Sequence, residues 1–218
     1  MATTVSGPAY PARLTVDYPE HLDRLTTLLR IFWAIPILII LALVAGGGST
    51  TTTTTTGDPS QTARATGAGI AGSLSFATAV MLIFRQRYPR WWFDFQLQLV
   101  RFSTRVGAYL ALLRDEYPST EDEQAVHVEL DYPDAARDLN RWMPLIKWLL
   151  ALPHYIILVF LVLFALVAIL VAWVVILVTG SYPRALFDFV VGVGRWALRV
   201  QAYAFLLITD RYPPFSLD

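Results

Sequence analysis

Strongly apolar blocks and narrow polar stripes alternate along the chain. Residues 28–44, 67–84 and 145–178 are apolar almost throughout. Because a helix needs about 20 apolar residues to cross a hydrocarbon core about 30 Å thick, the first two blocks are each predicted to be one membrane helix. Pro36 and Pro153 lie inside apolar blocks and predict a kink in each, since proline removes a backbone hydrogen bond.

The third block is too long for one crossing. As a single helix, residues 145–178 would be about 51 Å long. We therefore predict two short spans that turn tightly near residues 163–168. One long span is the alternative, but it would carry Arg184, Arg195 and Arg199 to the outer side, against the basic bias of cytoplasmic segments.

Two amphipathic helices are predicted, over residues 91–113 and 185–208. At about 100° per residue, each gathers its few polar side chains in one stripe. An arginine at the bilayer centre costs about 3 kcal/mol, so these helices are predicted to lie at the cytoplasmic interface, the alternative being that they are packed into the bundle. The stripes consist of Asp94, Gln98, Arg101 and Arg105 in the first helix, and of Asp188, Arg195 and Arg199 in the second.

The two halves of the chain carry matching motifs in the same order, which predicts a tandem duplication. We define a first unit, residues 1–120, and a second unit, residues 121–218. The matched pairs used below are Val16 with Leu130, Tyr18 with Tyr132, Arg24 with Arg141, Arg30 with Lys147, Tyr88 with Tyr182, Arg90 with Arg184, Asp94 with Asp188, Arg101 with Arg195, Arg105 with Arg199, Tyr109 with Tyr203, and Asp115 with Asp210.

Together these features predict an all-α integral membrane fold. Each unit holds a transmembrane helical hairpin, over about residues 28–84 and 145–180, followed by an amphipathic interfacial helix, which gives four transmembrane helices. Seven of the ten tyrosines precede proline, and most of these pairs flank a predicted helix, as interfacial anchors and helix boundaries do.

Two polar segments separate the apolar blocks. Residues 46–66 are rich in Thr and Gly and predict an exposed loop. Residues 114–137 form a polar linker between the units. Within the linker, residues 126–130 alternate apolar and polar, as residues 14–17 do, and both precede Tyr-Pro. The two segments are therefore predicted to pair as a small β-ladder on the cytoplasmic side.

Composition supports a membrane protein and gives its orientation. The chain is 56% hydrophobic and 16% charged, with a net charge of zero, so nothing in it suggests a nucleic-acid partner. It has no cysteine, which excludes disulfides and thiolate chemistry. Arg85, Arg87 and Arg90 cluster after the second apolar block, which predicts that both termini lie in the cytoplasm. The first residues lack a basic start followed by an apolar stretch, so no removable signal peptide is expected.

Few residues are candidates for a site. The stripe residues Asp94, Arg101, Arg105, Asp188, Arg195 and Arg199 could bind lipid headgroups or a partner, or could simply reach the interface and form intramolecular ion pairs. His154 could relay protons or touch a ligand, or could be hydrated near the membrane surface. The three histidines show no ligand spacing, and no catalytic motif is present, so no metal, cofactor or enzymatic activity is expected.

Residues 182–217 contain Tyr-Pro-Arg-Ala-Leu-Phe-Asp-Phe, Arg-Trp-Ala-Leu-Arg-Val-Gln-Ala-Tyr and Thr-Asp-Arg-Tyr-Pro-Pro-Phe-Ser-Leu, and Leu-Pro-His-Tyr precedes them at residue 152. In these motifs the chain resembles a bacterial membrane family known mainly from actinomycetes, domain-of-unknown-function family 4389. The first unit is a diverged copy, with Trp91-Trp92 in place of Ala-Leu. The resemblance implies a small inner-membrane protein and carries no activity with it.

The function expected from these observations is a non-enzymatic accessory or scaffold subunit of an envelope assembly, with membrane lipids and other membrane subunits as partners. The actinomycete resemblance adds a lipid transport complex as the expected assembly. The alternative is a small transporter or channel with its site between the two units, near His154 and the arginine stripes. Against that alternative, the apolar blocks offer almost no polar residues to line a path.

Overall fold

The computed structural model describes residues 10–45, 70–120 and 122–218, and most of them are helical. The Thr-rich segment at residues 46–66 and residues 1–9 lie outside the described residues. In chain order, the elements are β1 (Ala12–Val16), α1 (Arg24–Ala45), α2 (Ile70–Arg85), α3 (Arg90–Leu110), β2 (Val126–Leu130), α4 (Met143–Leu150), α5 (Leu152–Thr179) and α6 (Arg184–Ala204).

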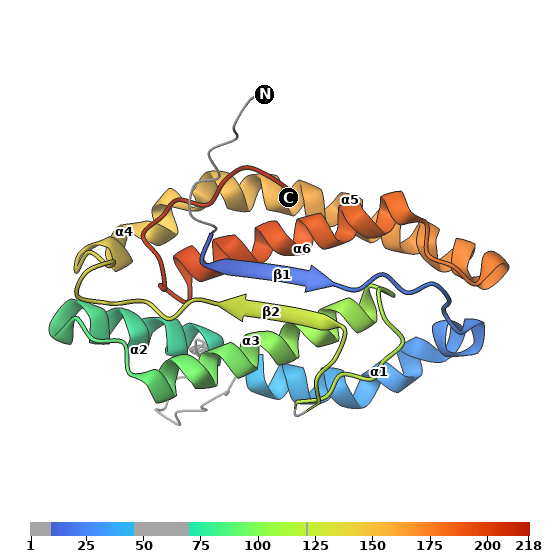
Figure 1. Ribbon diagram of the computed structural model, residues 1–218, viewed down its shortest axis with the longest axis horizontal. Coiled ribbons are helices and arrows are strands. Elements are labelled where there is room, and N and C mark those ends of the chain that lie inside the picture. The colour runs from blue at the N-terminus through green and yellow to red at the C-terminus, as the bar shows by residue number, and fades with distance from the viewer. Residues whose placement is uncertain (1–9, 46–69, 121) are drawn as a thin grey trace, which may run out of the picture.

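All the elements run roughly along the long axis of the molecule (Figure 1). β1 and β2 lie across the front of α6 and α3. The helix α5 runs along the upper edge, and α1 and α2 follow one another along the lower edge. The core lies between the sheet and the helices beneath it, where Leu14, Val128 and Val191 are buried.

The predicted β-ladder is confirmed, so the fold is not purely α-helical. β1 and β2 pair antiparallel, with Ala12 opposite Leu130 and Val16 opposite Val126. Because Val16 is matched with Leu130 in the sequence, Leu14 is matched with Val128, which is also its partner across the ladder. Exchanging the two units therefore maps the ladder onto itself, as rotation about a two-fold axis between Leu14 and Val128 would.

Each strand packs on the amphipathic helix of the other unit. β1 lies against α6, and β2 lies against α3. The Nε atom of Arg195 donates a hydrogen bond to the carbonyl oxygen of Leu14 at 3.0 Å, and that of Arg101 donates to the carbonyl oxygen of Val128 at 3.1 Å. The matched arginines thus hold the matched strands across the two units.

The Tyr-Pro segments that follow the strands also bind the opposite unit. The hydroxyl of Tyr18 donates to the carbonyl oxygen of Tyr182, and that of Tyr132 donates to the carbonyl oxygen of Tyr88. Arg184 lies over the ring of Tyr18, and Arg90 lies over the ring of Tyr132, at 3.9 and 4.9 Å. The tyrosines read from the sequence as interfacial anchors therefore also join one unit to the other.

The hairpin predicted over residues 145–180 is wrong. α5 is one continuous helix of 28 residues, about 42 Å long, and passes straight through the predicted turn at residues 163–168. That stretch holds no residue that stops a helix. Pro153 occupies the first turn of α5, where proline is tolerated, and the helix ends only at Gly180, in the left-handed conformation with φ 77°.

The first apolar block shows its predicted kink. The axis of α1 turns by 48° between Arg30 and Phe32, one helical turn before Pro36, whose ring displaces the carbonyl four residues earlier. In the third block, the helix is interrupted between α4 and α5, next to Pro153.

The amphipathic helices match their predicted positions, but four membrane helices are not supported. Among the described residues, α5 is the one unbroken helix long and apolar enough to cross a membrane. α1 would be a second if its two bent parts form one span, and α2 is shorter, at 16 residues. What the structure supports is a mostly helical fold with one clear membrane-capable helix.

Candidate functional site

The four stripe arginines are partly buried and donate hydrogen bonds to backbone carbonyl groups. Besides the two that hold the strands, Arg105 donates from Nη1 to the carbonyl oxygen of Ser119 at 2.7 Å, and Arg199 donates to that of Ser216 at 3.3 Å. Burial and the nearby Arg195 lower the pKa of Arg199. The arginines therefore organise the strand and the segment that follows each helix.

The stripe aspartates lie apart from the arginines. Asp94 and Asp188 are exposed, in the second turn of α3 and α6. Within the described residues, neither makes a hydrogen bond to an arginine of its own stripe. The stripes predicted from spacing alone thus divide into a partly buried cationic part and an exposed acidic part.

Two buried basic residues form matched ion pairs that the sequence analysis did not identify as sites. Lys147, 1% exposed, places Nζ 2.7 Å from Asp210 Oδ1 and donates to the carbonyl oxygen of Thr209 at 2.7 Å. Arg30, 3% exposed, pairs with Asp115 and donates to the carbonyl oxygen of Tyr109 at 2.8 Å. The sequence does mark both residues, because each is a single basic residue inside an apolar block.

The two ion pairs share their surroundings as well. Lys147 lies over the ring of Tyr203, and Arg30 lies over the ring of Tyr109. The second carboxylate oxygen of each acid accepts a backbone N–H: Asp210 from Asn140 at 2.6 Å, and Asp115 from Asp23 at 2.8 Å. Burial lowers the pKa of Lys147, and Asp210 opposes that shift. These contacts tie the chain after α3 and α6 to the start of α1 and α4.

His154 lies in a closed aromatic cage and is fully buried. Its Nδ1 accepts a hydrogen bond from Trp196 Nε1 at 3.0 Å, and its ring stacks on Phe215 at 4.1 Å and contacts Tyr212. Nε2 has no partner among the described residues. The hydrated position considered for His154 is thus wrong, and the ring instead fastens the C-terminal segment to α5 and α6.

A polar cluster joins α2 to α3. The Tyr88 hydroxyl lies 2.6 Å from Gln96 Oε1, and the Gln96 amide donates to Thr78 Oγ1 at 2.8 Å. Trp92 Nε1 donates to the same hydroxyl at 2.8 Å. Burial raises the pKa of Tyr88, and it raises that of its matched residue Tyr182 to about 12.

An apolar cavity of about 520 Å³ lies between α3 and α6, bounded also by α1, α2 and α5. It is lined at matched positions of the two units, as Leu41 with Leu158 and Ser103 with Ala197 show. Gln96 and Gln201 supply amide groups in an otherwise mostly apolar wall. Such a lining suits a hydrocarbon chain better than a hydrated solute.

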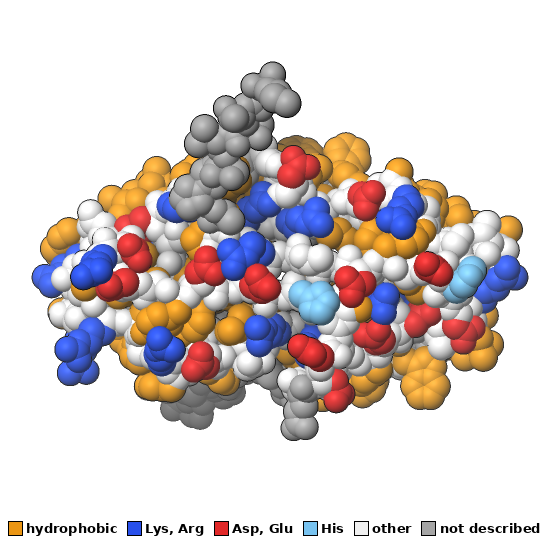
Figure 2. Space-filling model, in the orientation of Figure 1, with side chains coloured by type: hydrophobic (Ala, Val, Ile, Leu, Met, Phe, Trp, Pro, Cys, Tyr) orange, Lys and Arg blue, Asp and Glu red, His pale blue; other side chains and the backbone are white. Residues whose placement is uncertain are grey.

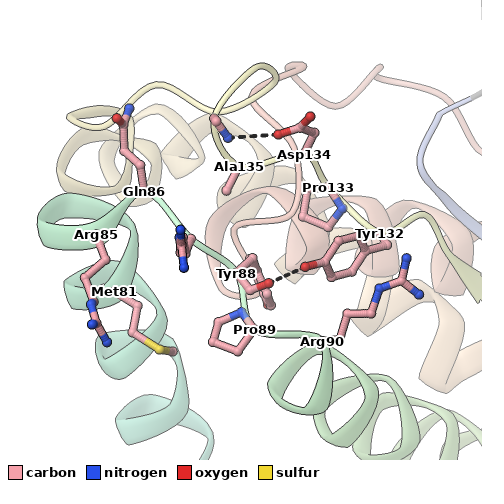
Figure 3. Close-up of a pocket in the computed structure, with 12 residues that line it drawn as sticks. Met81, Arg85, Gln86, Tyr88, Pro89, Arg90, Tyr132, Pro133, Asp134 and Ala135 are labelled. Carbon is pink, nitrogen blue, oxygen red and sulfur yellow. Dashed lines mark hydrogen bonds between the residues drawn. The ribbon is translucent and has the colours of Figure 1, made fainter.

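A second, basic cleft of about 990 Å³ lies where α2 meets α3 (Figure 3). Arg85 comes from the end of α2, Arg87 from the loop between α2 and α3, and Arg90 from the start of α3. Tyr132 and Asp134, which follow β2, form the opposite wall. The described lining residues carry three guanidinium groups and one carboxylate, so the cleft favours an anion.

In the described parts of the chain, no group of three or more His, Asp or Glu side chains comes together. The remaining two histidines are exposed, and His127 Nε2 lies 3.4 Å from Asp17 Oδ2 on the sheet. The features that stand out are thus buried ion pairs, an apolar cavity and a basic cleft.

The buried Lys147, the caged His154 and the arginines of α6 all lie in the second unit, where comparison with known families finds a match. Residues 141–216 match a domain of unknown function, DUF4389. The match supports the family resemblance seen in the sequence. No curated protein and no solved structure matches the chain.

The DUF4389 segment does not contain everything that packs against it. It includes α4, α5 and α6 and both partners of the Lys147–Asp210 ion pair. The strand that covers its last helix, β1, comes from outside the segment, as does Tyr18, which binds the Tyr182 carbonyl. In this chain, the DUF4389 segment therefore completes its core with residues of the first unit.

Proposed function

We propose that this protein is a non-enzymatic scaffold subunit of an inner-membrane assembly, built from two copies of one module and lying flat in the cytoplasmic leaflet. Its apolar helices rest among lipid chains, and its charged sheet faces the cytoplasm, where other subunits dock. The observation that carries the proposal is the separation of an exposed apolar surface from a charged one.

Two copies of one module are supported by the matched contacts. The ladder pairs Leu14 with its own counterpart, and the strand-holding arginines, the buried ion pairs and the Tyr-Pro contacts each occur twice. Independent origins would not place so many matched residues in matched contacts. The family match covers only the second copy.

The apolar surface is large and lies on the edge helices. In the most apolar stretch of α5, only 22% is buried. Val159, Leu170 and Val178 are 66%, 65% and 70% exposed. Phe32 and Trp33 of α1 and Trp148 of α4 are also more than half exposed. Exposed apolar surface on this scale marks a membrane or partner contact.

The sheet surface is charged. Figure 2 shows Lys, Arg, Asp and Glu side chains spread over the face formed by the strands, with hydrophobic side chains gathered toward the edges. Arg13, Glu129 and Asp131 form ion pairs on this face and are 42%, 64% and 52% exposed. Because the strands run along the same axis as α5, an upright α5 would carry these charges to bilayer depth, at about 3 kcal/mol for each.

A flat placement avoids that cost and satisfies the basic bias. Arg85 ends α2 and Arg87 follows it, at one end of the long axis, and Arg24 and Arg184 lie at the other end, where α1 and α6 begin. An upright molecule would expose one of these groups outside. A flat molecule keeps all of them on the cytoplasmic side, together with both termini.

Single-cysteine labelling tests this placement, since the chain has no cysteine of its own. Ala136→Cys and His21→Cys lie on exposed loops at opposite ends of the long axis, and Val167→Cys lies at the middle of α5. A membrane-impermeant maleimide should label both loop variants in inverted vesicles and neither in right-side-out vesicles. Val167→Cys should react only after detergent is added. Labelling of the two loops from opposite sides would show an upright molecule and overturn the placement.

The transporter alternative has one observation in its favour, the cavity between α3 and α6, but the apolar lining gives a hydrated solute no path. Purification from native membranes in mild detergent separates the two functions. A scaffold should bring down other membrane subunits, including those of a lipid transport complex if that is its assembly. A homo-oligomer that purifies alone and carries solute across liposomes would favour the transporter.

A further inference from the structure

The basic residues of the cleft have no basic counterparts in the second unit, except Arg90, which is matched with Arg184. Arg85, Gln86 and Arg87 line the cleft, yet the matched positions in the second unit are Thr179, Gly180 and Ser181. Other contacts around these positions are alike in the two units. Arg141 donates to Gln86 at 3.1 Å, and the matched residue Arg24 lies beside Gly180, the residue matched with Gln86. The extra positive charge is therefore a local feature of the first unit that the shared fold does not require.

The cations of this cleft are free to bind a ligand. Within the described parts of the chain, Arg85 and Arg87 are exposed and make no hydrogen bond or ion pair. Arg90 has its guanidinium over the Tyr132 ring, which leaves its N–H groups at the cleft edge. Asp134 is already engaged, because its carboxylate accepts the Ala136 N–H at 3.1 Å and lies 3.7 Å from Arg137.

The neighbours of the cleft place it beside lipid. Phe84, just before Arg85, is 77% exposed, and Trp91, just after Arg90, is 68% exposed. Aromatic side chains next to arginines are typical of the headgroup level of a bilayer. Guanidinium groups bind phosphate through paired N–H donors.

We propose that the cleft between α2, α3 and the segment after β2 binds the phosphate of an anionic phospholipid headgroup. Arg85 and Arg87 contact the phosphate, Arg90 and Tyr132 form the wall beside it, and the acyl chains lie along Phe84 and Trp91. The inference rests on the proposed placement in the membrane, which puts this end of the molecule at headgroup level.

The test compares binding of phosphatidylglycerol and phosphatidylcholine to the purified full-length chain by native mass spectrometry. The wild-type chain should retain phosphatidylglycerol preferentially. Arg85→Gln/Arg87→Gln should weaken that binding about tenfold or more, since each basic residue near a membrane surface contributes several-fold. The matched control is Arg24→Gln/Arg184→Gln, which removes the same charge at the opposite end and should keep the wild-type preference.

Several outcomes would overturn the site. These are an unchanged preference in Arg85→Gln/Arg87→Gln, an equal loss in both double variants, or displacement of the lipid by millimolar inorganic phosphate, which would indicate a site for soluble phosphate. Should the variant fail to fold, salt provides a test on the wild type: the preference should fall between about 0.1 M and 1 M, where screening shortens from about 10 to 3 Å. Cysteine labelling is independent, so failure of the membrane placement and failure of this site are distinguishable.

Discussion

Lys147→Met should lower the free energy of unfolding by about 3–5 kcal/mol, the cost of removing one partner from a buried ion pair. The variant leaves Asp210 beside the buried Tyr203 with only the Asn140 N–H to bind. Methionine fills nearly the same volume as lysine, so the loss reflects the unpaired carboxylate and not a cavity. Denaturant or thermal unfolding in detergent, followed by circular dichroism, measures the effect.

Lys147→Arg is the matched control, because Arg30 already occupies the same position in the first unit. It should retain most of the stability. Arg30→Met should reproduce the loss at Asp115. If Lys147→Met unfolds like the wild type, or if Lys147→Arg is equally damaging, the ion pair is not what stabilises this junction.

Arg101→Gln and Arg195→Gln should each cost about 1.5–3 kcal/mol, the range for a hydrogen bond from a charged donor. Each removes the contact that holds a strand on the helix of the other unit, at Val128 or Leu14. The same unfolding measurement applies, and backbone amides of β1 and β2 should also exchange hydrogen faster.

Asp94→Asn and Asp188→Asn are the controls for the arginine variants, since both side chains are exposed on the same helices. Each should change stability by no more than about 0.5 kcal/mol. If the arginine variants keep their stability and lose only a bound lipid or subunit, the stripes are binding sites, and their structural role is secondary.

Period-two alternation and stripe spacing were sufficient to predict the ladder and both amphipathic helices. These patterns are local and strong: β1 and β2 bury alternate residues, and α3 and α6 bury one face. What the arginines touch could not be predicted, because their partners, at Leu14 and Val128, lie far away in the sequence. The basic cleft likewise needs Tyr132 to meet Arg90, and no spacing shows that contact.

The hairpin predicted for the second unit repeats the pattern of the first unit, in which two apolar blocks flank the Thr-rich segment. The structure indicates the opposite relation: α1 and α2 follow one another along one edge, as the two halves of α5 do along the other. If the two units are copies of one module, as proposed, the Thr-rich segment lies at a point of the sequence where the second unit has one continuous helix. Apolar periodicity is the same in both cases and does not distinguish them.

The exchange of strands has a consequence for biosynthesis. β1 is synthesised before α1 to α5, and the helix that it covers, α6, is synthesised after them; the Tyr10 hydroxyl likewise donates to the carbonyl oxygen of Arg211. β1 therefore lacks its partner surface until α6 has been translated. Contacts so distant in the chain form slowly, so nascent copies should depend on an insertase or holding chaperone, and ribosomal stalling before α6 should leave β1 open to protease.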